Sequence, residues 1–439
     1  MEDDYHDKSE KPKLDNTLSA PTTIEPPSPL PMAKEQKDTG FWGDFNYDKK
    51  TFPKCPPAVN KTELDEFLGK IYDVGVSDVV IQSGNRCFIK RSNAFYKVTE
   101  RAFRGKEVDD LVAIMHREST PGKVKSGKPV KFHYVVPIVK RGKDGTDEIE
   151  YARFRVICTA CMGQHGASDG IEITMRSVAA YPPTMDEINL PKGIQDMAFP
   201  SSGLFIIVGE TDSGKSTTLG SIMREWSVRP SAVKIITYED PVEHDLKATP
   251  NTTACIAQTS VGEGEMIPNW AACIPNAIRR NPDIIMLGEI STLETMQNVI
   301  SAARAGHTVY TTLHAGNVAL AFDRIISEFP QNEQSLAREA LRTTVRGVVH
   351  QSLLKHKDGV KRVAVHEWLE FDSYEWEILK KAGESGLYEA LQSLVETRGR
   401  SQLIDLESKK ELIDPDSYLS AYRSLTDRNE QPKSQDHGK

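Results

Sequence analysis

LFIIVGETDSGKSTT, residues 204–218, contains the most specific motif of this chain. Its first five residues form an apolar run typical of a buried strand, and GETDSGKS then matches G-x-x-x-x-G-K-[ST] at every defined position. In such a loop backbone N–H groups surround a phosphate, Lys215 supplies a mobile positive charge, and the Ser216 hydroxyl is a ligand for Mg²⁺. The helix that begins here adds the positive end of its dipole. The motif predicts nucleotide binding, and a glycine-rich turn with a chance lysine is the alternative. The predicted nucleotide-binding residues are Gly209, Thr211, Asp212, Ser213, Gly214, Lys215, Ser216 and Thr217.

Length and charge set the first limits on fold and function. The chain has 439 residues, which suggests two folded domains plus tails. Its net charge of −8 and isoelectric point of about 5.9 give no overall attraction to nucleic acid or anionic lipid, although a local basic groove could lie within an acidic total. No apolar run approaches the roughly 18–20 residues of a membrane span, and the first residues do not resemble a secretory signal. We expect a cytoplasmic protein that reaches a membrane only through partners.

Composition divides the regions outside the P-loop domain into three segments. Residues 1–55 are polar and proline-rich, and we expect a disordered tail because ordering it would cost about 1–2 kcal/mol per residue with little burial in return. A docking tail and a passive extension both fit this segment. Residues 58–180 have helical spacing at 62–72 followed by short strand patterns, which indicates a small α+β domain. Residues 372–439 have a helical pattern with a frayed end.

The segment 186–371 alternates apolar strand runs with amphipathic helices and follows a break at Tyr181-Pro182-Pro183. This alternation is typical of an α/β fold in which a mostly parallel sheet is covered by helices on both faces. Ligands of such sheets lie at the carboxyl ends of the strands. Functional residues are therefore expected directly after each apolar run.

Two carboxylates occupy such positions. Glu239 follows the strand run at 233–237, and we expect it near a metal ion, in part through water, because Mg²⁺ is usually held by one or two carboxylates and several waters. Glu289 ends DIIMLGE, where it would orient and deprotonate the water that attacks a γ-phosphoryl group. A charge that caps the next helix is the alternative at Glu289. A helix N-cap acid followed by a turn proline would explain Asp240-Pro241 but not Glu239.

Basic side chains are the remaining candidates. His307 and His314 flank the predicted strand 308–313, and His314 could sense a γ-phosphate or link subunits, whereas a lone histidine is more often structural. Phosphoryl transfer also requires a cation, and no arginine adjoins the P-loop. The Arg-Phe-Arg sequence on an alternating strand puts two arginines on one face, for which a solvated basic face is the alternative. The candidate arginines, all in the small domain, are Arg153, Arg155 and Arg176.

One cysteine pair, Cys158 and Cys161, has metal-like spacing. A single C-x-x-C without a second pair or a nearby histidine is weak evidence for zinc. Both residues lie at the end of a strand pattern, so we expect buried or half-buried thiols rather than a metal site.

Four ordered motifs resemble those of one family. GETDSGKS, ITYEDPVEH, NPDIIMLGE and AGHTVYTTLHAGN resemble the Walker A motif, Asp box, Walker B motif and His box of the type II/type IV secretion ATPases, the traffic ATPases that include the PilT-like motors. The similarity extends from about Lys61 to Phe371 and includes RFRV, VRGVVHQSLL and KRVAVHEWLEF. Four motifs in this order are far more specific than a P-loop alone.

The resemblance implies a RecA-like ATPase domain preceded by a PAS-like domain, and a homohexamer that binds ATP and Mg²⁺. It also implies a cytoplasmic protein that associates peripherally with the bacterial inner membrane through secretion, conjugation or pilus components. The residues that would carry the family's catalytic roles are Lys215, Glu239, Glu289, His307, His314, Arg153, Arg155 and Arg176, with Ser216 and Glu239 as ligands of Mg²⁺.

Two features depart from the family pattern. Ser291-Thr292 stand where Arg-Asp usually follow the catalytic glutamate, which argues against a strict assignment to the PilT motors. No cysteine follows Cys273, so the tetracysteine zinc insert of the pilus-assembly and type II secretion branch is missing from the sequence. The proline-rich tail fits a conjugation or type IVB secretion motor better than a minimal retraction ATPase.

Three functions remain open from the sequence. The first is a hexameric ATPase that powers type IV secretion, conjugation or pilus dynamics. The second is a RecA-like motor that acts directly on nucleic acid, which would need a basic, aromatic-rich stacking surface that the acidic composition does not suggest. The third is a nucleotide-gated scaffold with little turnover. We expect no direct binding of nucleic acid.

Overall fold

A computed structural model describes residues 60–73, 76–91, 94–99, 101–141, 147–163, 169–178, 181–262, 266–359, 361–383 and 385–430. The predicted disordered tail, residues 1–55, lies outside these ranges, as do the last nine residues. Within the described ranges, no helix combines the length and the apolar character that a membrane crossing requires.

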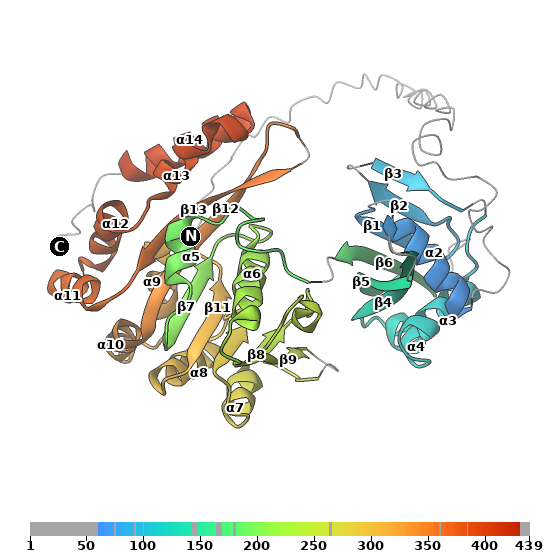
Figure 1. Ribbon diagram of the computed structural model, residues 1–439, viewed down its shortest axis with the longest axis horizontal. Helices are drawn as coiled ribbons and strands as arrows, with labels where there is room; N and C mark the ends of the chain where they lie inside the picture. Colours follow the sequence, from blue (N-terminus) through green and yellow to red (C-terminus); the bar gives the residue numbers. More distant parts are fainter. Residues whose placement is uncertain are drawn as a thin grey trace, which may run out of the picture. The chain divides into compact units, whose positions relative to one another are not determined.

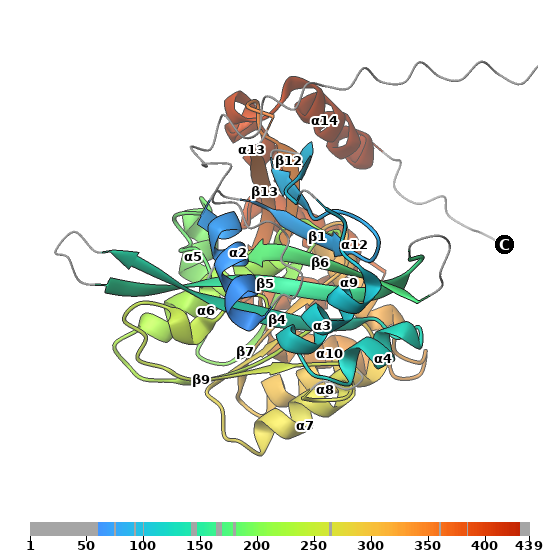
Figure 2. The same ribbon diagram turned by 90° about the vertical axis from the view of Figure 1, so that its right-hand side faces the viewer.

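The small domain is an antiparallel sheet of six strands with three helices packed on it (Figure 2). The strand order is β3-β2-β1-β6-β5-β4. The helix expected at 62–72 is confirmed as α2, and strands follow it along the chain as the short strand patterns indicated. The elements are α2 (Lys61–Asp73), β1 (Asp78–Gln82), β2 (Phe88–Arg91), β3 (Ala94–Lys97), α3 (Gly105–Met115), α4 (Thr120–Lys125), β4 (Val130–Arg141), β5 (Asp147–Cys161) and β6 (Gly170–Val178).

The two faces of this sheet differ in chemistry. Along β5, Ala152, Phe154 and Val156 are fully buried on the face that the helices cover. Arg153 and Arg155 alternate with them and therefore share the opposite face, as predicted from the Arg-Phe-Arg sequence. The small domain thus presents two arginines on the face that its own helices do not cover.

The P-loop domain is an α/β unit built on a seven-stranded sheet (Figure 1). Its order is β13-β12-β7-β11-β10-β8-β9, and all neighbours are parallel except the β12–β13 pair. The expectation of a mostly parallel sheet is confirmed. The elements are α5 (Lys192–Met197), β7 (Gly203–Val208), α6 (Lys215–Val228), β8 (Lys234–Glu239), η2 (Leu246–Ala248), β9 (Cys255–Ser260), η3 (Trp270–Ala272), α7 (Cys273–Ile278), β10 (Ile284–Leu287), α8 (Leu293–Arg304), β11 (Thr308–Leu313), α9 (Val318–Ser327), α10 (Gln334–Thr344), β12 (Val345–Lys355) and β13 (Arg362–Glu370).

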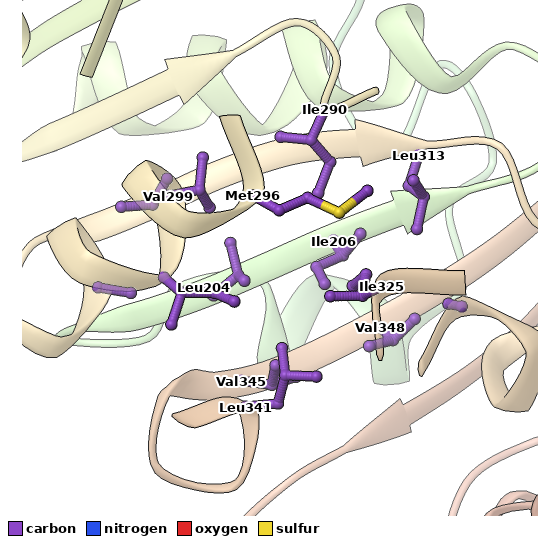
Figure 3. Packing of buried hydrophobic residues seen from close by; sticks show 14 of the residues in the cluster. Leu204, Ile206, Ile290, Met296, Val299, Leu313, Ile325, Leu341, Val345 and Val348 are labelled. Carbon is purple, nitrogen blue, oxygen red and sulfur yellow. The ribbon is translucent and has the colours of Figure 1, made fainter. Parts of the chain in front are cut away.

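Strand β7 lies inside the sheet and is buried on both faces, which explains its continuous apolar run. Leu204 and Ile206 pack with residues of α8, α9 and α10 on one face (Figure 3). Phe205 and Ile207 point to the other face and pack with residues of α5 and α6. Full burial of such side chains stabilises the fold by about 1.5–3 kcal/mol each. The core on both faces fixes the end of β7, and therefore the start of the P-loop.

Helices also follow β13, in agreement with the helical pattern predicted beyond residue 371. Of these, α12 packs with α9, and α13 lies against β13. A small apolar cluster joins Val363 and Val365 of β13 to Leu406 and to side chains of the last helix. The helices are α11 (Ser373–Ala382), α12 (Leu387–Thr397), α13 (Gln402–Ser408), η4 (Lys410–Leu412) and α14 (Pro415–Glu430).

Candidate nucleotide-binding site

The P-loop connects β7 to α6 and adopts backbone angles that favour glycine. Gly209 has φ 153° and Gly214 has φ 86°, while Asp212 also lies in the left-handed region with φ 63°. A Cβ at Gly209 would lie 2.3 Å from the backbone oxygen of Gln351, and one at Gly214 would lie 2.7 Å from the Gln351 side-chain nitrogen. Both glycines of the motif are therefore required by the neighbouring strand β12 as well as by the loop conformation.

Lys215 begins α6 and is only 9% exposed. Its ammonium donates hydrogen bonds to the carbonyl oxygens of Gly209 at 2.9 Å and Glu210 at 2.7 Å. Burial lowers the pKa of Lys215, and the negative charges of Glu289 and then Glu210 act in the opposite direction. Lys215 follows β7 and Glu289 follows β10, and both strands run parallel to β11 between them, so the two residues lie at the same edge of the sheet.

The turn that carries Glu289 is fixed from two neighbouring strands. The backbone N–H of Gly288 donates to the oxygen of Tyr238 at the end of β8, at 2.8 Å. On the other side, the hydroxyl of Thr312 in β11 donates to the Gly288 oxygen at 2.6 Å. The backbone oxygen of Thr312 accepts from the N–H of Ile290 at 3.0 Å. A Cβ at position 288 would lie 3.2 Å from the Tyr238 oxygen, so the missing side chain lets these strand ends approach.

Glu239 ends β8, the strand next to β10, and lies beside this turn. Its Oε1 accepts hydrogen bonds from the hydroxyl of Thr237 at 2.6 Å and the side-chain amide of Gln258 at 3.2 Å. Burial raises the pKa of Glu239, and these hydrogen bonds, with one from the N–H of Glu243, act to lower it. Glu239 is thus oriented by neutral donors, and a cation nearby would favour its ionised form.

The oxygen donors at this edge suit a hard cation. Ser216 is an exposed residue in the first turn of α6, Glu239 ends β8, and Glu289 follows the neighbouring strand β10. Hydroxyl and carboxylate oxygens, with free positions for water, are the ligands that Mg²⁺ prefers. The positive end of α6 and the left-handed glycines likewise suit a phosphate group. The residues present therefore fit a nucleotide bound with Mg²⁺.

The two histidines lie at opposite ends of one strand. His314 follows β11 at the end where Leu313 pairs with Val208, directly before the P-loop. His307 precedes the other end of β11, where its ring nitrogen Nδ1 is 3.3 Å from the Pro282 oxygen. Six residues of strand span about 20 Å. The structure therefore brings His314, but not His307, to the P-loop edge of the same chain.

The three predicted arginines pair with acids of two different segments. Arg153 lies 3.3 Å from Asp245, and Arg155 lies 3.1 Å from Glu243. Both acids follow β8 in the segment after Glu239. Arg176 instead donates to Asp78 of β1 at 2.9 Å. Its charge is also among the weaker influences that lower the pKa of Asp212, in the P-loop.

His133 lies beside these arginines and makes the chain sensitive to acid. Burial lowers its pKa to about 4, and the positive charges of Arg153, Arg155 and His244 add to this effect. An unfolded histidine titrates near 6.5, so between pH 6.5 and 4 the unfolded chain binds more protons and stability falls as the pH falls.

Between pH 6.5 and 4.5 the free energy of unfolding should fall less for the His133→Gln variant than for the wild-type protein. We expect the difference between the two falls to be about 1–2 kcal/mol, which allows for the partial solvent exposure of His133. The measurement is the free energy of unfolding in urea at several pH values. If the free energy of unfolding falls equally with pH in the two proteins, neutral His133 is not the source of the acid sensitivity.

The sequence did not reveal the residues that hold the P-loop in place. Gln351 of β12 is buried against the loop. Arg362 of β13 makes a double contact with Asp212, whose carboxylate lies 2.7 and 3.2 Å from the guanidinium. This ion pair keeps the pKa of Asp212 below its usual range. Gln351 could have been noticed because it is a polar side chain within the largely apolar strand sequence VRGVVHQSLL. No local sequence pattern indicates a role for Arg362.

The thiols behave as expected from the sequence. Cys158 is buried and Cys161 is half-buried at the end of β5, and both are free. Burial raises the pKa of the Cys158 thiol to about 12, so it stays protonated and unreactive at neutral pH.

Comparison with known proteins gives one family. The model of a family described as "Type II/IV secretion system protein" matches residues 184–418. The type IV pilus retraction ATPase PilT of Pseudomonas aeruginosa is 28% identical over 308 residues, which cover 70% of this chain and 81% of PilT. The type IV pilus ATPase PilU of the same organism is 32% identical over 199 residues, covering 45% of this chain and 50% of PilU.

Solved structures agree with this result. The ATPase DotB of Legionella pneumophila is 31% identical with a TM-score of 0.69, and the match covers 85% of this chain and 98% of DotB. The pilus retraction motor PilT with bound ADP has a TM-score of 0.66 over 82% of this chain and 96% of PilT, at 24% identity, and therefore supports the fold alone.

Proposed function

Because this chain belongs to the type II/IV secretion system protein family, we propose that it is an ATPase whose hydrolysis of ATP powers a type IV secretion, conjugation or pilus machine. One observation carries the proposal for this chain. Glu289 follows β10 and the P-loop Lys215 follows β7, and the parallel order β7-β11-β10 brings a candidate base and a phosphate-binding cation to one edge of the sheet. A P-loop that served only as a structural turn would not need a carboxylate at the same edge of the sheet.

Each residue at this edge has a chemical role in the proposal. The N–H groups of the P-loop and Lys215 bind phosphate oxygens, and Glu289 orients the attacking water and accepts its proton. Ser216 and Glu239 would hold Mg²⁺, which would supply positive charge to the phosphate oxygens. His314 lies at the same edge, where it senses the γ-phosphate. The small-domain residues Arg153, Arg155 and Arg176 supply further positive charge; in the described structure each pairs with a carboxylate.

The assembly and location follow from the resemblance. We propose a cytoplasmic homohexamer that associates with the inner membrane through components of the machine it serves. His307 lies away from the P-loop edge of its own chain. If it has a role in catalysis, that role is exerted across a contact between subunits of the hexamer.

The test is hydrolysis of ATP by the purified full-length protein. We expect Mg²⁺-dependent release of phosphate that single-stranded DNA does not stimulate and that Lys215→Ala reduces by about 100-fold or more, because the lysine is the only cation placed within the loop. Hexamers should appear by mass photometry in the presence of ATP. Lys247→Ala, an exposed lysine in η2, is the control and should retain wild-type turnover.

The other two functions give different results in the same assay. Stimulation of hydrolysis many-fold by single-stranded DNA would favour a motor that acts on nucleic acid. Assembled rings that bind ATP without releasing phosphate would favour a nucleotide-gated scaffold. Either result would contradict the proposed secretion motor.

A further inference from the structure

Gln351 contacts the P-loop from the neighbouring strand β12. It is 2% exposed and lies in the part of β12 that is parallel to β7, one residue after the pair formed by His350 and Val208. Its amide nitrogen donates to the backbone oxygen of Ser213 at 2.7 Å. Its amide oxygen accepts from the hydroxyl of Thr218 at 2.7 Å. One buried side chain therefore joins the loop to the first turn of α6.

The contact with Ser213 has a geometric consequence for phosphate binding. The peptide that joins Ser213 to Gly214 is planar and trans, so its C=O and N–H point in opposite directions. Because Gln351 holds the C=O on the β12 side, the N–H of Gly214 is directed away from β12. P-loops bind phosphate with N–H groups of this kind. The left-handed φ of Gly214 is the backbone angle that allows this orientation.

The backbone of Gln351 constrains the start of the loop as well. Its carbonyl oxygen would lie 2.3 Å from a Cβ at Gly209, so the strand and the loop are in close contact at both glycines of the motif. By comparison, the ion pair of Arg362 with Asp212 is exposed on both sides, and such pairs contribute about 0–1 kcal/mol. A buried amide whose two partners have no access to water is the stronger constraint.

We infer that Gln351 is a positioning residue for nucleotide binding, which acts by fixing the Ser213–Gly214 peptide and the first turns of α6. This inference rests on the proposed function, because it assumes that the loop binds a nucleotide. In this view β12, a strand outside the motif, holds the N–H of Gly214 in the orientation that binds phosphate.

Substitution by leucine and by glutamate separates this role from general stability. Gln351→Leu removes both hydrogen bonds, and we expect the dissociation constant for a fluorescent ADP analogue to rise by about 10-fold or more at every pH. Gln351→Glu replaces the donor by a carboxylate that faces the Ser213 oxygen when ionised. When protonated, the introduced carboxyl can donate to Ser213 and accept from Thr218, as the amide does.

The pH profile is therefore the decisive measurement. The affinity of Gln351→Glu relative to wild type should be about 10-fold lower at pH 8.5 and should recover as the pH is lowered to 6, because burial raises the pKa of a carboxyl group. Fluorescence anisotropy with the full-length protein gives these constants. If the leucine variant fails to fold, the glutamate series alone decides the question.

A matched control lies on α13 and contacts the residue next to Gln351 in β12. Gln402 is also buried, at 7% exposure, and its amide donates to the hydroxyl of Ser352 at 2.6 Å without a hydrogen bond to the P-loop. Gln402→Leu should lower the melting temperature but leave the dissociation constant within about 2-fold of wild type.

The outcomes distinguish this inference from the proposed function. Wild-type protein that fails to bind the ADP analogue would overturn both. Wild-type binding with an unchanged constant for Gln351→Leu, or a pH-independent ratio for Gln351→Glu, would overturn the role of Gln351 alone.

Discussion

Replacing Glu289 by glutamine should slow ATP hydrolysis about 1,000-fold and leave the dissociation constant for ATP within about 3-fold of wild type. The amide has nearly the same shape as the carboxylate but cannot accept a proton from water. The turn should keep its position, because its backbone is held by Thr312 and by the Tyr238 oxygen rather than by the Glu289 side chain. Phosphate release and binding of a fluorescent ATP analogue measure the two quantities.

Glu210→Gln is the matched control for the change in charge. Glu210 is exposed in the P-loop, and its carboxylate also favours the positive charge of Lys215, although less than Glu289 does. Removing this charge should change turnover by no more than about 3-fold. Equal losses for both variants would show that the charge near Lys215, and not a proton acceptor at position 289, limits the reaction. Full turnover by Glu289→Gln would remove the catalytic role of this residue.

Much of the candidate site could be predicted because parallel strands end together. The apolar runs before Glu239 and Glu289 were visible in the sequence, and neighbouring parallel strands bring such residues to one edge. The same argument places His314 at that edge, since β11 pairs with β7. His307 differs because it precedes β11. The motif AGHTVYTTLHAGN therefore contains two histidines, His307 and His314, that lie at opposite ends of this strand.

The contacts that hold these residues could not be predicted from local patterns. Gln351 and Arg362 contact P-loop residues that lie more than 130 positions away in the sequence. The strand pairing that brings them together is not revealed by sequence periodicity. Alternation along β5 correctly put Arg153 and Arg155 on one face. Their acidic partners follow β8 in the other domain, and such contacts depend on packing rather than on spacing.

The hairpin of β12 and β13 links several parts of the P-loop domain. Gln351 and Arg362 contact the P-loop, while Glu367 accepts a hydrogen bond from the N–H of Val318 at 2.8 Å, at the start of the helix that follows His314. The last helices pack on the same hairpin. A change in how these helices pack on the hairpin should therefore affect the strands that support the nucleotide-binding edge.

That attachment depends on a polar cluster in which His366 and Asp405 are buried and Lys409 is partly buried. The carboxylate of Asp405 accepts from the backbone N–H of His366 at 2.9 Å and from the ammonium of Lys409 at 2.7 Å. Lys409 also donates to the Ala364 oxygen at 2.8 Å. Burial acts to raise the pKa of Asp405, but the hydrogen bonds from His366 and Lys409 outweigh it and hold the pKa below its usual range.

Asp405→Ala should therefore destabilise the protein by about 3 kcal/mol, the lower end of the range for a buried pair, because it leaves the ammonium of Lys409, whose side chain is 16% exposed, without a counter-charge. Urea unfolding measures the loss, and hydrogen exchange should show that protection falls first in α13 and β13. Glu377→Ala is the control: it breaks an exposed pair with Lys381 at 2.9 Å and should cost less than about 1 kcal/mol. Adding Lys409→Met to Asp405→Ala should restore part of the stability by removing the unpaired charge. If the double variant is no more stable than Asp405→Ala alone, the loss comes from the His366 hydrogen bond and not from the unpaired ammonium.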